Sequence, residues 1–348
     1  MSKIETFKFD LSFALESGES LSGFKLAFQT FGKLNADKSN VIWIVHALTA
    51  NSDPTEWWPG VVGKNKAINP QDHFIVCANA LGSNYGSTNP LDINPDTSNK
   101  YYHAFPFLTN RDIVNSFIAL KNHLGITSIH TMVGASLGGQ QALEWSIMEP
   151  NTIKNLILIA TNAKHSPYGV AFNESQRLAI EADQTWKEYR DDAGYAGLIA
   201  ARSIALLSYR TSAGYNTTQQ DFEHKIDNYK ASSYQRYQGS KLVKRFNTYS
   251  YWLLTKAMDS HDVGRNRGSI EKALSSIKSD VFAIGIDSDF LFPVSEQKTI
   301  VNHVKKATYF EISSKLGHDG FLTERKKVSD IIKKVVKPNP DTAYLKAG

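Results

Sequence analysis

The chain has 348 residues, of which 41% are hydrophobic and 21% charged, a balance typical of a globular protein with a sizeable core. Its 39 Lys and Arg residues exceed its 34 Asp and Glu residues only mildly, for a formal net charge of +5, and the excess is spread along the sequence. This pattern excludes the dense basic stripe of a nucleic-acid-binding protein. The length allows one large domain or two ordinary ones.

The single cysteine, Cys77, excludes an intrachain disulfide and lies in an apolar run that predicts a buried strand. The N-terminal segment lacks the long apolar stretch of a signal peptide. A run of about 18 apolar residues, which a membrane-spanning helix needs, is also absent from the sequence. We therefore expect a cytoplasmic protein.

Residues 1–35 predict antiparallel strands, and short apolar runs then alternate with helical patterns along the chain. The runs that predict strands are 41–45, 74–76, 129–133, 156–159, 281–285 and 308–312. Apolar residues spaced three or four apart predict helices over 111–124, 137–149, 295–305 and 322–335. Alternating strands and helices predict a mostly parallel sheet that helices cover on both faces.

The stretch 164–262 interrupts this alternation, because it is rich in Tyr, Arg, Gln and Asn and predicts consecutive helices without strands. We interpret 1–163 and 263–348 as one core domain and 164–262 as a helical lid inserted between two parts of its sheet. Active sites of open parallel sheets lie at the carboxyl ends of the strands. A lid inserted at this point would therefore cover the site.

A tight turn with the sequence G-A-S-L-G-G, residues 134–139, lies between the strand at 129–133 and the following helix. This strand–turn–helix context is what the G-x-S-x-G nucleophile elbow requires, and Gly134 and Gly138 supply its small neighbours. Ser136 would protrude at the helix N-terminus, where backbone N–H groups favour developing negative charge. The pattern predicts an α/β-hydrolase fold with Ser136 as the nucleophile.

Serine needs a base that an acid orients, and in this fold the chain order is Ser, then Asp or Glu, then His. His318 lies in a Gly-flanked loop after the last predicted strand and is the predicted base. The acid belongs in the loop after 281–285, where Asp287 and Asp289 both qualify and position does not choose between them. His46 and His130 lie in or at the ends of strands, and we expect structural roles for them.

An oxyanion hole in this fold uses the backbone N–H of the residue after the nucleophile, here Leu137, and a second N–H from the loop after an early strand. That loop is 46–50, which follows the strand at 41–45. Backbone donors require no particular side chain, so both assignments rest on position.

Ten short segments, in this order, resemble the homoserine O-acetyltransferase family of the α/β-hydrolase superfamily. They are HALT at 46–49, WWPG at 57–60, NALGS at 79–83, GST at 86–88, TNRD at 109–112, QALEW at 141–145, NESQR at 173–177, YSYW at 249–252, DSHDV at 259–263 and GHDGF at 317–321. Each segment is weak by itself, and their combination in order makes the resemblance specific.

The resemblance implies roles for further residues. The family pattern Ser-Asp-x-Leu-x-Pro matches 288–293, which implies Asp289 as the triad acid, and the family's early loop matches at Leu48 as the second oxyanion donor. The resemblance also implies that Arg202 and Asp319 bind the amino-acid substrate. A guanidinium can grip the carboxylate of a zwitterion, and a carboxylate can hold its ammonium group. Arg210 is the next candidate.

The activity that the resemblance implies is ping-pong transfer of acetyl from acetyl-CoA to the hydroxyl of L-homoserine, through an acyl-Ser136 intermediate, in methionine biosynthesis. Acetyl-CoA would be a co-substrate, and neither a bound cofactor nor a metal is expected. The expected partners are small-molecule substrates, without nucleic acid or membrane. The resemblance also implies a homodimer through the lid helices.

Some residues depart from the family pattern. The usual elbow is Gly-Gly-Ser-Met-Gly-Gly, so Ala135 and Leu137 differ, and Ala50 stands where the family commonly has glycine. These changes touch the acyl pocket, so succinyl-CoA as donor and serine as acceptor stay open. A serine esterase with the same triad is a second alternative, and a catalytically inactive interaction module is a third.

Overall fold

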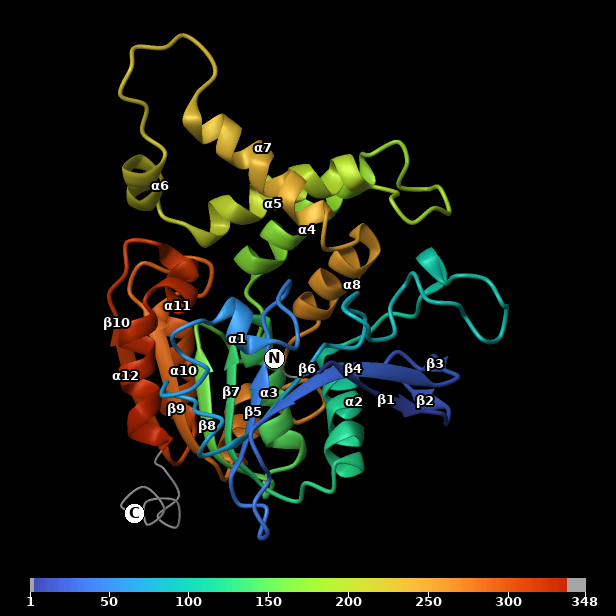
Figure 1. Cartoon of the computed structure of the whole chain (residues 1–348), viewed down its shortest axis with the longest axis vertical. Coiled ribbons are helices and arrows are strands. Elements are labelled where there is room, and N and C mark those ends of the chain that lie inside the picture. The colour runs from blue at the N-terminus through green and yellow to red at the C-terminus, as the bar shows by residue number, and fades with distance from the viewer. Residues whose placement is uncertain (1–2, 337–348) are drawn as a thin grey trace.

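The structure, a computed structural model, describes residues 3–336. At its centre lies an 8-stranded sheet (Figure 1). In spatial order its strands are β1 (Glu5–Phe9), β4 (Phe24–Phe31), β6 (Phe74–Ala78), β5 (Val41–Val45), β7 (Ile129–Ala135), β8 (Ile153–Ile159), β9 (Asp280–Ile286) and β10 (Ala307–Ile312). Strands β1, β4 and β6 pair antiparallel, and all pairs from β6 to β10 are parallel. Two short strands, β2 (Phe13–Ala14) and β3 (Ser20–Leu21), pair separately. All the strands predicted from apolar runs are present.

Successive side chains of the central strands enter two different cores, one on each face of the sheet. In β5, Trp43 and Val45 belong to the first core, whereas Ile42 and Ile44 belong to the second. Because side chains alternate along a strand, a continuous apolar run fills both cores at once. Cys77 of β6 lies in the second core and is fully buried, as the apolar run around it predicted.

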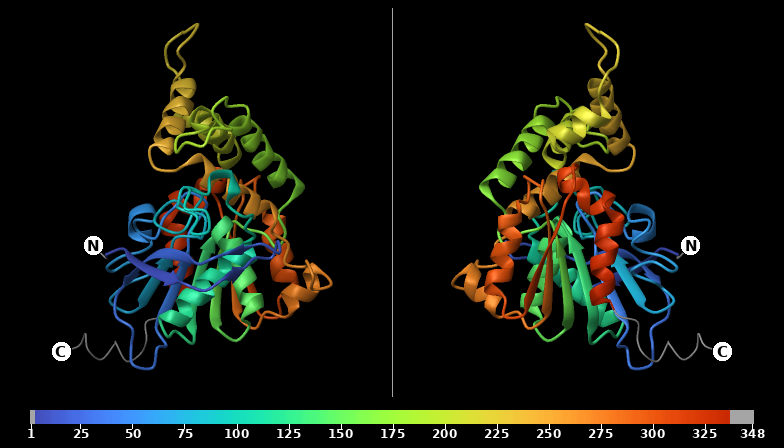
Figure 2. Two further views of the ribbon diagram at one scale, coloured as in Figure 1. Left: turned by 90° about the vertical axis from the view of Figure 1, so that its right-hand side faces the viewer. Right: turned by 90° about the vertical axis from the view of Figure 1, so that its left-hand side faces the viewer.

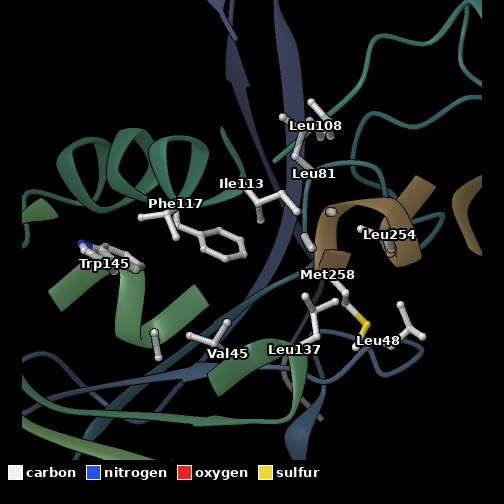
Figure 3. Close-up of a cluster of buried hydrophobic side chains, with 14 of the residues drawn as sticks. Val45, Leu48, Leu81, Leu108, Ile113, Phe117, Leu137, Trp145, Leu254 and Met258 are labelled. Carbon is white, nitrogen blue, oxygen red and sulfur yellow. The ribbon is translucent and has the colours of Figure 1, made fainter. Parts of the chain in front are cut away.

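Helices cover both faces of the sheet (Figure 2). The first face is covered by helices α2 (Asn110–His123), α3 (Leu137–Met148), α9 (Ile270–Ser275) and α10 (Val294–His303). The second face is covered by α1 (Pro54–Trp57) and α12 (Arg325–Val335). The start of α2 is fixed by a capping box in which Thr109 and Asp112 each bond the other's backbone N–H. Trp145 of α3 packs edge-on against Trp43, with ring centroids 5.0 Å apart (Figure 3 shows Trp145).

The single helix predicted over 322–335 is wrong, because two helices occupy this part of the chain. They are α11 (Gly320–Thr323) and α12, and Glu324 between them has φ −81° and ψ 47°, outside the helical region. The apolar residues of α12 and both Phe321 and Leu322 of α11 contact the second core, and Phe321 also packs edge-on against His318 at 5.3 Å. Because the two helices face one core, their apolar residues fit a single helical pattern although the backbone breaks at Glu324.

Between β8 and β9 the described chain contains helices and no strand. The helices before α9 are α4 (Pro167–Glu181), α5 (Tyr195–Tyr209), α6 (Ser212–Thr218), α7 (Lys230–Val243) and α8 (Thr248–Asp259). They lie beyond the carboxyl ends of the parallel strands (Figure 1). Where the chain enters and leaves this region, Lys164 and Asp262 form an isolated antiparallel bridge.

We call residues 164–262 the helical insertion. The division of the chain into a core domain and a lid stays a prediction, and its core segments include residues 1–2 and 337–348, which lie outside the described residues. Within residues 3–336, no helix is long and apolar enough to cross a membrane.

Candidate active site

Ser136 lies at the junction of β7 and α3 with φ 55° and ψ −127°, a conformation that residues other than glycine rarely adopt. The turn is so tight that a Cβ atom on Gly134 would lie 2.3 Å from the Gly138 carbonyl oxygen. A Cβ atom on Gly138 would lie 2.2 Å from the carbonyl oxygen of Val45. The Ser136 N–H donates to the Ile159 carbonyl at 3.0 Å, which ties the turn to the neighbouring strand. The surrounding sheet thus holds the strained conformation.

The hydroxyl of Ser136 is the first member of a buried chain of hydrogen bonds. Ser136 Oγ lies 2.9 Å from His318 Nε2, and His318 Nδ1 lies 2.6 Å from Asp289 Oδ2. The other carboxylate oxygen of Asp289 accepts the N–H groups of Leu291 and Phe292 at 3.0 and 2.9 Å. Since a neutral imidazole that donates from Nδ1 has its lone pair on Nε2, this arrangement can remove the Ser136 proton.

Asp287 and Asp289, the two candidates for the triad acid, have different surroundings. Asp289 is bonded to His318, whereas Asp287 Oδ1 accepts the Ser314 N–H at 3.0 Å. Although burial alone would raise the pKa of Asp287, the bonds that it accepts, among them that from Ser314, lower it overall. Asp287 therefore joins the loop after β9 to the loop after β10 and does not contact the imidazole.

The second predicted oxyanion donor lies in the loop 46–51, which we call the oxyanion loop. A turn in this loop is closed by the Ala50 N–H, which donates to the Ala47 carbonyl at 3.0 Å, and His46 Nδ1 bonds the same carbonyl at 2.8 Å. Because the Ala47 carbonyl and the Leu48 N–H share one planar peptide unit, holding the carbonyl also orients the N–H. Within residues 3–336, neither the Leu48 N–H nor the Leu137 N–H has a hydrogen-bond acceptor.

The two histidines expected to be structural have local hydrogen-bond partners. His46 Nε2 accepts the Ala80 N–H at 2.9 Å, so the ring proton is on Nδ1, and burial lowers the pKa of His46 to about 4. His130 Nδ1 bonds Thr131 Oγ1 at 2.9 Å on β7. A neutral His46 is thus a fixed support of the oxyanion loop.

Apolar packing joins the oxyanion loop to the elbow. The side chains of Leu48 and Leu137 are buried in the first core, near Met258 and Leu254 of α8 (Figure 3). The same cluster therefore holds the two residues predicted to be backbone donors and one helix of the insertion. Displacement of α8 would disturb the packing on which both donors depend.

A cavity of about 510 Å³ lies over Ser136 and His318, between the core and the helical insertion. The insertion lines it with Arg202, Tyr209, Gln238, Lys241, Leu242 and Arg245. From the core, the oxyanion loop, Trp57 and Asp319 contribute. No group of three His, Cys, Asp or Glu residues that could hold a metal ion occurs in the described part of the chain.

The two residues predicted to bind the substrate both line this cavity. Arg202 lies on α5 with its guanidinium carbon 5.6 Å from the Tyr209 ring centroid, and no carboxylate within residues 3–336 forms an ion pair with it. Asp319 Oδ2 instead accepts Arg210 Nε at 2.8 Å. Arg210 does not line the cavity, so it contacts Asp319 from outside the cavity and holds its carboxylate in place.

Sequence reasoning missed Tyr209 and Arg245, which both line the cavity. The ring of Tyr209 lies 5.7 Å from that of His318, and burial raises the pKa of its hydroxyl. Arg245 ends the run K-L-V-K-R, residues 241–245, which has the composition of an ordinary solvated helix end. The sequence around Tyr209 and Arg245 contains no motif that marks them as site residues, because both reach the cavity only when the insertion packs on the core.

Comparison with known proteins first defines the class of the chain. The family model described as "alpha/beta hydrolase fold" matches residues 40–325. The crystal structure of esterase E22 has a TM-score of 0.89 at 23% identity, covers 97% of this chain and 100% of that chain, and shows the likeness of fold alone. The predicted α/β-hydrolase fold is therefore confirmed.

The family follows from nearer relatives. A homoserine O-acetyltransferase of Cyclobacterium marinum is 50% identical over 329 residues, which cover 94% of this chain and 94% of that protein. The crystal structure of homoserine O-acetyltransferase from Bacillus anthracis has a TM-score of 0.90 at 25% identity and covers 97% of this chain and 99% of that chain. The chain belongs to the homoserine O-acetyltransferase family, an acyltransferase family within the α/β-hydrolase fold, which confirms the resemblance seen in its sequence.

Proposed function

We propose that the protein transfers an acetyl group from acetyl-CoA to the hydroxyl of L-homoserine, with Ser136, Asp289 and His318 as its catalytic triad. The observation that carries the proposal is one cavity lined by the Ser136 hydroxyl, by the carboxylate of Asp319 and by the guanidinium of Arg202, which has no carboxylate partner within residues 3–336. This combination suits an acceptor that is a zwitterion. The name of the relative that is 50% identical supports the same acceptor.

In the first half-reaction, His318 takes the Ser136 proton while Oγ attacks the thioester carbonyl of acetyl-CoA. The oxyanion that forms accepts hydrogen bonds from the N–H groups of Leu48 and Leu137, each contributing about 3 kcal/mol. When the intermediate collapses, the carbon–sulfur bond breaks and His318 returns its proton to the departing thiolate. Acetyl-Ser136 and free CoA are the products.

In the second half-reaction, His318 takes the proton of the homoserine hydroxyl, which attacks the acetyl-Ser136 carbonyl. The ester bond to Ser136 breaks, and its oxygen recovers the proton from His318. Arg202 holds the substrate carboxylate and Asp319 the ammonium group, with Arg210 fixing the orientation of Asp319. The product is O-acetyl-L-homoserine, and no metal or bound cofactor takes part.

Two alternatives have specific requirements. A succinyl donor needs a cation beside the acyl group. The residues next to Ser136, namely Ala135, Leu48 and Leu137, are apolar and buried, and the cations that line the cavity, Arg202, Lys241 and Arg245, all lie on the insertion. An esterase needs access of water to the acyl-enzyme, but the insertion over the cavity does not separate the two activities, since esterase E22 shares the fold over its whole length. The choice of an amino-acid acceptor therefore rests on Arg202 and Asp319 in the cavity and on the name of the curated relative.

The test is to supply acetyl-CoA or succinyl-CoA, with and without L-homoserine or L-serine, and to follow release of the CoA thiol. We expect sustained release only with acetyl-CoA and L-homoserine together. Release that ignores the amino acid would identify a hydrolase, and a preference for succinyl-CoA would overturn the donor.

The Ser136→Ala variant is the first control for this assay. Loss of the nucleophile should lower kcat by at least about 10⁴-fold, because members of a triad act as a unit. Acetyl transfer by the variant at a rate near that of the wild type would contradict the role of Ser136. Circular dichroism should show that the variant remains folded.

We further propose a cytoplasmic homodimer that takes only small-molecule substrates and supplies methionine biosynthesis, with residues 164–262 as its lid. Large apolar side chains exposed on the insertion support the dimer: Tyr168, Leu178, Tyr189, Leu207, Phe222, Ile226, Tyr229 and Tyr237. Exposed apolar groups gathered in one region are typical of a contact surface.

A further inference from the structure

The helical insertion reaches the oxyanion loop through Arg245, which lies in the turn between α7 and α8. Arg245 Nη1 donates to the Thr49 carbonyl at 2.5 Å, and Nη2 donates to Thr49 Oγ1 at 3.3 Å. The same Nη1 donates to the Tyr85 hydroxyl at 2.6 Å. One guanidinium therefore bonds the main chain one residue after Leu48.

The position of Arg245 is itself fixed, although its side chain is exposed. Asn84 Nδ2 donates to the Arg245 carbonyl at 3.0 Å. The next residue, Phe246, is fully buried, and its ring packs edge-on against Tyr85 at 5.6 Å. The guanidinium thus stands where the docked turn between α7 and α8 places it.

The turn that contains Leu48 is held by hydrogen bonds from both the core and the insertion. At its start, His46 and the Ala50 N–H hold the Ala47 carbonyl, and both belong to the core. At its end, Arg245 is the donor within residues 3–336 that reaches the Thr49 carbonyl, and it belongs to the insertion. The insertion therefore supplies the bond to the Thr49 carbonyl, whereas core groups hold the carbonyls on either side of it, Ala47 through His46 and Asn51 through Trp57 Nε1 at 2.9 Å.

We propose that Arg245 is a positioning residue that keeps the Leu48 N–H aimed at the oxyanion while the insertion is docked. The inference rests on the proposed function, in which Leu48 is an oxyanion donor. A planar guanidinium can bond the Thr49 carbonyl, its hydroxyl and the Tyr85 hydroxyl together, which the single ammonium group of a lysine cannot reproduce. Opening of the insertion would release the Thr49 carbonyl, which lies next to Leu48, and so weaken the oxyanion hole.

A different role for Arg245 would be to bind a phosphate of the acyl donor, because Arg245 and Lys241 both line the cavity. The hydrogen bonds of its guanidinium are directed at Thr49 and Tyr85, which favours positioning. The two roles separate when the acyl donor lacks phosphate. p-Nitrophenyl acetate is such a donor, and it acylates a nucleophilic serine with release of p-nitrophenol.

The experiment measures acylation of the Arg245→Met variant by acetyl-CoA and by p-nitrophenyl acetate. We expect kcat/KM to fall roughly 10- to 100-fold with both donors, through kcat, because a misplaced donor loses transition-state stabilisation. Arg245→Lys keeps one donor and should recover part of the rate. Lys244→Met removes an adjacent exposed charge outside the cavity lining and should match the wild type.

Two outcomes would overturn the proposal. One is a defect confined to acetyl-CoA and expressed as a raised KM, which would make Arg245 a phosphate ligand, and the other is unchanged acylation by both donors. If Arg245→Met does not fold, the test uses Arg245→Lys. A lowered kcat of this variant with p-nitrophenyl acetate would support positioning, and an unchanged kcat would overturn it. A wild-type protein that p-nitrophenyl acetate acylates but that transfers to no amino acid would refute the proposed function, while the Arg245 comparison would still stand.

Discussion

Among single residues, Arg202 in the cavity and Glu296 on α10 have surroundings that support specific predictions. Arg202 faces the cavity without a carboxylate partner in the described structure, whereas Asp319 is paired with Arg210. Glu296, on α10, accepts the Asn162 Nδ2–H at 2.9 Å. We therefore expect the guanidinium of Arg202 to bind the substrate carboxylate. We expect the half-buried carboxyl of Glu296 to make the stability of the protein depend on pH.

The Arg202→Met variant separates the two half-reactions. Because acylation precedes binding of the amino acid, we expect acyl-enzyme formation from acetyl-CoA to be unchanged. The KM for L-homoserine should rise roughly 100-fold, since loss of a charge-assisted, bidentate bond removes about 3 kcal/mol of binding. Single-turnover acylation and steady-state kinetics measure the two effects. A variant that acylates slowly would contradict the assignment of Arg202 to the acceptor.

Glu296 should make the stability of the protein depend on pH. Burial raises the pKa of this carboxyl to about 7, with the Asp289 charge adding to the rise and the Asn162 bond opposing it. The folded state thus binds a proton that the unfolded chain releases near its ordinary pKa of 4.5. This contribution to stability is fully present below pH 4.5 and is lost as the pH rises through about 7.

The Glu296→Gln variant removes this titration. Between pH 5 and pH 8 the variant should lose less stability than the wild type, so its unfolding midpoint relative to the wild type should rise with pH. Glu223→Gln, at an exposed position, serves as the control and should show no such trend. A difference between Glu296→Gln and the wild type that is constant across this range would contradict the assignment.

At the scale of elements, the β7–α3 junction and the helical insertion both contact the proposed oxyanion hole. The elbow has no room for a Cβ atom at Gly134 or Gly138, so two strands and one helix can approach closely enough to present Ser136. In the oxyanion loop, His46 holds the Ala47 carbonyl, Trp57 holds the Asn51 carbonyl, and Arg245 of the α7–α8 turn holds the Thr49 carbonyl between them. Core and insertion thus both hold the backbone around Leu48, the proposed second oxyanion donor.

Gly138→Ala tests the packing of the junction. Its Cβ would lie 2.2 Å from the Val45 carbonyl oxygen, so β5 or α3 must shift. We expect a loss of about 1–3 kcal/mol in the free energy of unfolding, together with a large fall in kcat. Ala135→Gly provides a comparison, since a shorter side chain creates no collision there. Urea unfolding and acylation kinetics are the measurements, and wild-type stability in Gly138→Ala would contradict the close approach.

For the whole molecule, the exposed apolar side chains lie largely on the insertion, away from the sheet. Phe222 and Ile226 are among the most exposed, in the segment between α6 and α7 that projects from the molecule (Figure 2). An apolar surface in this place is suited to a second copy of the chain. Such a contact would hold the insertions of two copies against each other.

A double substitution, Phe222→Asp with Ile226→Asp, should weaken the proposed dimer. Two buried charges without partners oppose association, so sedimentation should give a mass near 38.8 kDa for the variant and twice that for the wild type. Leu11→Asp, at an exposed position in the N-terminal region, is the matched control and should leave the mass unchanged. A monomeric wild type would contradict the proposal.

The sequence by itself determined the strands, most helices and the elbow, because these depend on local period and on the residue types of a few neighbours. Ser136 and its glycines are encoded within one short segment, and the buried strands by their continuous apolar runs. The helix break at Glu324 escaped prediction because Leu322, before the break, and the apolar residues of α12, after it, contact the same core, so their spacing fits one helix.

Only the tertiary structure decided which distant groups meet. By position alone Asp287 and Asp289 were equivalent, and the contact of Asp289 with His318 distinguishes them. The pairing of Arg210 with Asp319 and the bond from Arg245 to Thr49 join segments far apart in the chain. Such contacts depend on how the insertion docks on the sheet, and side-chain period carries no information about that docking.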